Sequence, residues 1–153
     1  MALQLLDDFE EEDFSIFGIS SKVMDEVKFI YSINRLFKTK FKRQPSLDIQ
    51  WDDQIFCYSL YSHSVQKDFE EFFIIKNLSH PSKKEMDSDL LFSSLDSERS
   101  MLRNHKHFDY LLKIPYYIES DDINPLPLNE ADFISDFSLI TNLSNKDKKL
   151  FFI

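Results

Sequence analysis

The sequence predicts a single α+β domain over 1–153, built mainly from an antiparallel sheet, with a long N-terminal helix and shorter C-terminal helical segments. Three observations support this prediction. The chain of 153 residues has the length of one ordinary domain. Hydrophobic residues make up 42% of it and include 16 Phe and 6 Tyr, enough to fill one core. No internal repeat and no linker rich in Pro or Gly divides the chain.

The first half of the chain is expected to begin with a strand over 13–20, where DFSIFGIS carries strand formers on both faces. A helix over about 22–38 follows, with Ser20 and Ser21 as its caps. Its buried side is predicted from apolar residues at near-helical spacing, namely Val23, Val27, Ile30, Tyr31 and Phe37. Three further strands are expected at 47–50, 54–62 and 70–78, the last two as an antiparallel hairpin.

The second half begins with residues 79–100, which are rich in Ser and charge and are expected to form a mobile loop. Alternating apolar and polar residues predict a strand over 105–114 with one buried face. A short helix over 129–137 is expected with Asn129 as its cap. The closing sequence LSNKDKKLFFI predicts a short helix or turn that leads into a docked strand.

Charge and composition exclude several classes of function. The chain has 27 acidic and 18 basic residues and a net charge of −9, which argues against direct nucleic-acid binding. Gly18 is its only glycine, so the glycine-rich phosphate loops of nucleotide-binding enzymes are excluded. The sequence has no basic leader and no apolar run of membrane-spanning length. We therefore expect a cytoplasmic protein without membrane contact.

The sequence shows no catalytic centre, and we expect no cofactor. One group of possible metal ligands supports an alternative function. On a strand, His105, His107 and Asp109 would share a face, and they resemble the HxHxD opening of metallo-β-lactamase-type hydrolases. That class uses further His and Asp residues on glycine-containing loops. A small metal-dependent hydrolase with a degenerate site is therefore retained as an alternative.

A cluster of cations interleaved with aromatic residues is the candidate surface for a partner. It comprises Arg35, Phe37, Lys38, Lys40, Phe41, Lys42 and Arg43. Exposed aromatic and Arg side chains anchor protein interfaces, so the leading hypothesis is a non-catalytic accessory protein that binds another protein. Cations also stabilise a helix C-terminus without any partner. A second alternative is an accessory protein that touches RNA through the same patch.

Asp109 and Tyr110, together with the order of the predicted elements, resemble the IPExxxDY family, small cytoplasmic proteins of Bacteroidota. The likeness covers nearly the whole chain and rests on short segments: Gly18-Ile19-Ser20, Ile33-Asn34, Ile75-Lys76-Asn77, FDYLLKI and KKLFFI. At the Ile, Pro and Glu positions of the family motif, this chain has Arg103, Asn104 and His105. The resemblance implies a cytoplasmic protein without an established activity and marks Asp109 and Tyr110 as motif positions.

Overall fold

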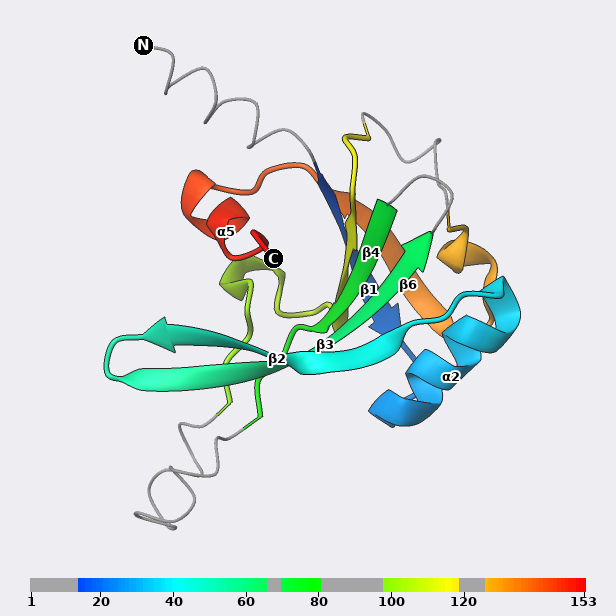
Figure 1. Ribbon diagram of the computed structural model, residues 1–153, viewed down its shortest axis with the longest axis horizontal. Helices are drawn as coiled ribbons and strands as arrows, with labels where there is room; N and C mark the ends of the chain where they lie inside the picture. The colour runs from blue at the N-terminus through cyan, green and yellow to red at the C-terminus, as the bar shows by residue number, and fades with distance from the viewer. Residues whose placement is uncertain (1–13, 66–69, 81–97, 119–125) are drawn as a thin grey trace.

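A computed structural model describes residues 14–65, 70–80, 98–118 and 126–153. Within them, six strands form one antiparallel sheet in the order β2-β3-β4-β5-β1-β6 (Figure 1). The strands are β1 (Ser15–Ser21), β2 (Lys42–Trp51), β3 (Gln54–Val65), β4 (Glu70–Lys76), β5 (Tyr110–Ile114) and β6 (Ile134–Ile140). The helices are α2 (Glu26–Phe37) and α5 (Asn145–Lys149), and the short 3-10 turns are η1 (Arg103–His105) and η2 (Leu128–Glu130).

The sheet dominates the described part of the chain, so the predicted α+β class with a long N-terminal helix is wrong. The helix α2 has 12 residues and begins after Asp25, whose carboxylate accepts a hydrogen bond from the Lys28 amide at 2.9 Å. Ser20 and Ser21 belong to β1, where they pair with β6, and so do not cap the helix. The predicted helix over 129–137 is also wrong, because its first two residues end the 3-10 turn η2 and its last four begin β6, which pairs with β1.

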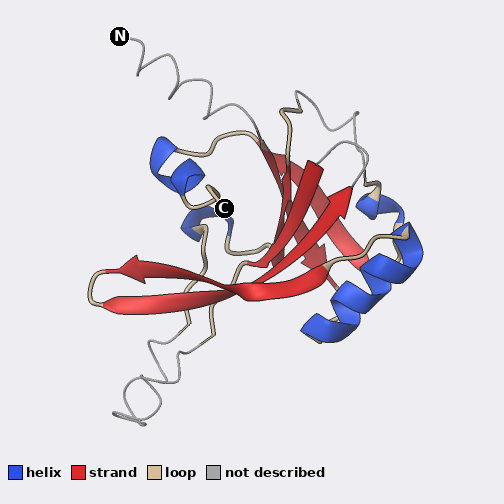
Figure 2. Cartoon of the chain, viewed as in Figure 1, coloured by secondary structure: helices blue, strands red, loops and turns tan. Residues whose placement is uncertain are grey.

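Both faces of the sheet are covered (Figure 2). The helix α2 and η2 cover one face, while Met101, Leu102 and Phe108, which flank η1, and Phe151 after α5 contribute to the other core. Because successive side chains of a strand point to opposite faces, β5 places Tyr110 and Leu112 in the first core and Leu111 in the second. The strand predicted over 105–114 with one buried face therefore starts later, at Tyr110, and is buried on two faces.

Other local predictions are confirmed. The strand expected over 13–20 is β1, and the hairpin is β3 with β4, in a register that pairs Leu60 with Ile75 and Val65 with Glu70. The strand expected over 47–50 is longer than predicted and begins at Lys42. At the C-terminus α5 is present, but Phe151 is buried without forming a strand.

The loop predicted over 79–100 is only partly covered by the structure. Residues 81–97 lie outside the described residues, so the mobility of this loop stays a prediction. At its two ends the chain is held by backbone bridges, one between Leu78 and Ser100 and one between Cys57 and His80. The first bridge joins the two ends of the loop to each other, and the second joins its N-terminal end to β3.

The only glycine of the chain lies where a side chain crosses β1. Gly18 is in the middle of the strand, and the buried ring of Phe108 packs directly on it. A Cβ atom at this position would lie 2.3 Å from the nearest ring atom, well inside contact distance. Gly18 therefore allows the segment that precedes β5 to pack closely against β1.

Replacing Gly18 with Ala is expected to lower the free energy of unfolding by about 1–3 kcal/mol, because the Phe108 ring must move within a packed core. Urea denaturation of the full chain measures this loss. In a Phe108→Leu background the same substitution should cost less, since leucine has no ring to displace. An equal loss in the two backgrounds would contradict the close-approach explanation.

Candidate functional site

The cations of the predicted partner surface are distributed over a helix, a connection and an edge strand. Arg35 lies in the last turn of α2, and Lys38 ends the helix in a left-handed conformation with φ 55°. Lys40 lies in the connection that follows, while Lys42 and Arg43 begin β2. All five residues are exposed, but they do not form a single helix end, since Arg43 contacts Glu26 in the first turn of α2 while Arg35 lies in the last.

The two aromatic residues that were predicted to anchor a partner are not exposed. Phe41 is 4% exposed and lies in the core beneath α2, and Phe37 is half-buried against the same core. Asn34 explains this position, because its side chain accepts from the Phe41 amide at 2.8 Å and donates to the Phe41 carbonyl at 3.1 Å. These bonds fold the connection back under the helix. Phe41 is therefore not on the surface, whereas Phe37 is partly accessible, and a role for these residues in partner binding stays a prediction.

A histidine on β3 holds the same connection. The Lys40 amide donates to Nδ1 of His63 at 3.0 Å, and the imidazole packs against the rings of Phe41 and Phe72. Burial, followed by the charge of Lys40, lowers the pKa of His63 from its usual value. The neutral imidazole is therefore the form that the folded chain favours.

A stripe of apolar side chains is exposed on the outer side of α2. Met24 just before the helix is 84% exposed, Val27 is 72% exposed and Tyr31 is 63% exposed. Their spacing of three and four residues places them on one side. The sequence analysis assigned Val27 and Tyr31 to the core, which is wrong.

The helix has a second apolar stripe, and this one is buried in the core. Phe29, Ile30 and Ile33 are buried, and the Phe29 ring stacks on Tyr110 with ring centroids 3.9 Å apart. Helical periodicity alone does not show which of the two stripes is buried, because the residues of each are spaced three and four positions apart. The stacking of Phe29 on Tyr110 of β5, and the hydroxyl that Tyr31 would have to bury, favour the stripe that contains Phe29.

Three cations border the exposed stripe. Lys28 and Arg35 are exposed on α2 two turns apart, and Lys38 follows at the helix end. Among the described residues, the salt bridges join Glu26 to Arg43 and to Lys76 and involve none of these three cations. We name this surface the α2 surface, and its members are Met24, Val27, Lys28, Tyr31, Arg35 and Lys38.

Arg43 has a role within the fold. Its guanidinium donates to Oε2 of Glu26 at 3.2 Å, and the Tyr61 hydroxyl donates to the same oxygen. Oε1 of Glu26 lies 3.7 Å from the ammonium of Lys76. Burial and the hydrogen bond to Glu26 raise the pKa of Tyr61 to about 12. This network connects the first turn of α2 to β2, β3 and β4, which fixes the helix on the sheet.

The two motif positions also contact the fold itself. Tyr110 is buried against Phe29, and burial raises the pKa of its phenol. Asp109 accepts from the Ser21 amide at 2.8 Å, and its own amide donates to the Ile19 carbonyl at 2.8 Å. Asp109 therefore joins the start of β5 to the end of β1.

The histidines do not share a strand face with Asp109. His105 ends η1 and His107 lies in the following turn, with 6.2 Å between their ring centroids. The side chain of Asn77 draws this segment out of strand geometry by donating to the carbonyls of His105 and Phe108, each at 3.0 Å. The part of the chain that the structure describes holds no group of three or more His, Cys, Asp or Glu side chains placed to bind a metal ion. The predicted alignment on one strand is wrong.

No model of a known protein family, no curated protein and no solved structure matched this chain. In the described ranges, no helix has both the length and the apolar character needed to cross a membrane. The candidate site is therefore interpreted from its own geometry.

Replacing His63 with Asn is expected to reduce the pH dependence of stability. The folded pKa of His63 is lowered, so its neutral form stabilises the fold above about pH 6.5, and this contribution is lost as pH falls further. An Asn amide oxygen can replace Nδ1 as an acceptor but does not titrate. Urea denaturation between about pH 7.5 and 5.5 should show a shallower loss in His63→Asn than in wild type.

The control for this experiment is His80→Asn, because His80 is exposed and contacts β3 through its backbone amide. Its pH profile should match that of the wild type. If His63→Asn also matches the wild type, protonation of His63 is not coupled to folding.

Proposed function

We propose that this chain is a non-catalytic binding protein that captures an acidic protein partner through the α2 surface. The observation that carries the proposal is the exposed apolar stripe of Met24, Val27 and Tyr31 beside three cations. Exposed apolar residues in a polar rim are typical of protein interfaces. A partner segment with apolar side chains flanked by carboxylates complements this surface in both shape and charge.

The two parts of the surface serve different purposes. Burial of Tyr31 and Val27 in the interface supplies affinity, since aromatic and aliphatic anchors account for most binding energy. Lys28, Arg35 and Lys38 attract and orient a carboxylate-bearing partner, chiefly by raising the association rate. The surface thus favours a partner that carries both features.

The helix that carries this surface is held in place before any partner binds. Its N-terminus is capped by Asp25, Glu26 joins it to three strands, and Phe29 stacks on Tyr110. A rigid surface loses little conformational entropy when it is buried, which favours binding. This arrangement supports binding of a partner protein more directly than it supports catalysis.

The proposal changes the predicted partner surface while keeping its basic character. Val27 and Tyr31 replace Phe37 and Phe41 as the apolar anchors, and Arg35 and Lys38 are retained. Arg43 is engaged by Glu26, so it contributes less to a partner. A cytoplasmic location and the resemblance to the IPExxxDY family remain part of the proposal.

The test compares two variants of the α2 surface against a partner that is recovered with the wild-type chain and then purified. Tyr31→Ser should weaken the measured affinity at least about tenfold, because it removes a central anchor. Arg35→Glu/Lys38→Glu should slow association, with a larger effect at low salt than at high salt. Surface plasmon resonance at two salt concentrations measures both effects.

A matched control uses an exposed apolar residue and an exposed cation elsewhere, Ile55→Ser and Lys106→Glu. All of these variants should keep their unfolding free energy within about 1 kcal/mol of wild type, because the sites are exposed. If Tyr31→Ser binds as tightly as wild type, or the purified ligand is an RNA, the proposal is wrong.

A further inference from the structure

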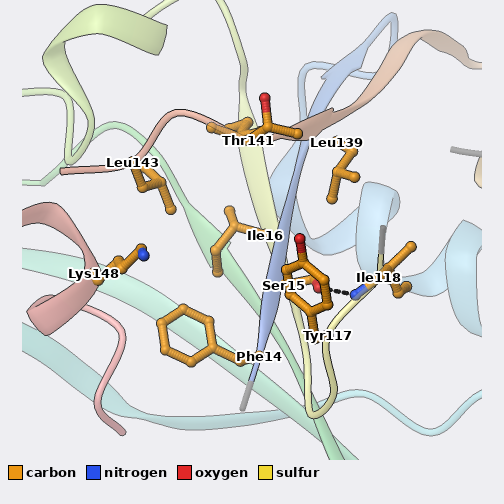
Figure 3. Close-up of a pocket in the computed structure, with 10 residues that line it drawn as sticks. Phe14, Ser15, Ile16, Tyr117, Ile118, Leu139, Thr141, Leu143 and Lys148 are labelled. Atoms are coloured by element: carbon orange, nitrogen blue, oxygen red, sulfur yellow. Dashed lines mark hydrogen bonds between the residues drawn. The ribbon is translucent and has the colours of Figure 1, made fainter. Parts of the chain in front are cut away.

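A pocket of about 540 Å³ opens between the start of β1, the end of β6 and α5 (Figure 3). Six of its ten lining residues are apolar, namely Phe14, Ile16, Ile118, Leu139, Ile140 and Leu143. Ser15, Tyr117, Thr141 and Lys148 complete it. We name it the β6 pocket. Its volume lies in the range of roughly 300–1,000 Å³ that is usual for small-molecule sites.

The fold keeps the walls of this pocket in place. Ile16 pairs with Ile140 across the β1–β6 ladder, and both are buried. The Ser15 hydroxyl donates to the Tyr116 carbonyl at 2.9 Å and accepts from the Ile118 amide at 2.7 Å. These bonds attach the segment after β5 to the start of β1. The pocket is therefore lined by residues that the sheet already orders.

A single cation faces the apolar lining. Figure 3 shows Lys148 across the pocket from Ile118, with its ammonium nitrogen directed toward Ile16. None of the salt bridges among the described residues involves Lys148. The lining also contains the hydroxyl groups of Thr141 and Tyr117. A pocket that combines aliphatic side chains with hydroxyl groups and one ammonium group matches a molecule with an aliphatic body and one negative charge.

We propose that the β6 pocket binds an aliphatic monocarboxylate of medium chain length. The Ile and Leu side chains suit a flexible hydrocarbon chain, and Lys148 suits a single carboxylate. The described lining contains no Arg, whose planar guanidinium is the usual partner of a phosphate group. A second negative charge on the ligand would have no cation in this lining. The site lies at α5 and is distinct from the α2 surface.

Decanoate is the probe for this proposal, with decanol as its uncharged analogue, and both are kept below the concentration at which decanoate forms micelles. Isothermal titration of the full chain should show saturable binding of one decanoate per chain. Lys148→Gln should weaken decanoate binding about tenfold and leave decanol binding within about twofold of wild type. Lys146→Gln, on the same helix but outside the lining, should bind both as wild type does.

A second measurement locates the ligand. Methyl resonances of Ile16, Ile118, Leu139 and Leu143 should shift on addition of decanoate, and Leu143→Trp should abolish binding of both probes by filling the pocket. Thermal unfolding checks that each variant is folded. The proposal is overturned if decanoate shows no saturable binding, if the shifts occur elsewhere, or if Lys146→Gln weakens decanoate binding as much as Lys148→Gln.

Discussion

The buried side chain of Asn77 determines how the central strands of the sheet are joined. It is 1% exposed, donates to the carbonyls of His105 and Phe108, and accepts from the Leu102 amide. An unpaired buried polar group costs about 1–3 kcal/mol, so these three backbone groups depend on the Asn77 amide. The bonds hold the segment before β5 as a turn next to β4. The chain then enters β5 at Tyr110, and the Phe108 ring packs on Gly18.

The position of β5 determines the position of α2. The ring of Tyr110 stacks on the ring of Phe29, and this contact determines which side of the helix faces the sheet. Glu26 then reaches Tyr61, Arg43 and Lys76 on three neighbouring strands. Once this side is buried, the stripe containing Val27 and Tyr31 must face outward. The exposed α2 surface is thus a consequence of core packing, and its rigidity has the same origin.

The two proposed sites have no residue in common. The helix α2 packs on the core that contains Phe29 and Tyr110, while α5 leads into Phe151 in the other core. The β6 pocket draws on both cores, since Ile118 belongs to the core beneath α2 while Ile16 and Ile140 belong to the other. A ligand in the β6 pocket and a protein on the α2 surface do not compete for the same residues. The shared sheet gives both sites a common, ordered support.

Local sequence patterns determined the strand at 13–20, the hairpin of β3 with β4 and the C-terminal helix, because strand alternation and capping residues act over short distances. They also predicted a basic surface around Arg35 and Lys38, and both residues are exposed. Only the tertiary structure decided that residues 134–140 form an edge strand, since the unpaired side of β1 offers backbone partners that the local sequence does not show. It also decided that Phe41 is buried, because the Asn34 side chain binds the Phe41 backbone beneath α2. Tyr31 is exposed because Phe29, on the other side of the helix, stacks on Tyr110, and the spacing of apolar residues along the sequence does not show which side is buried.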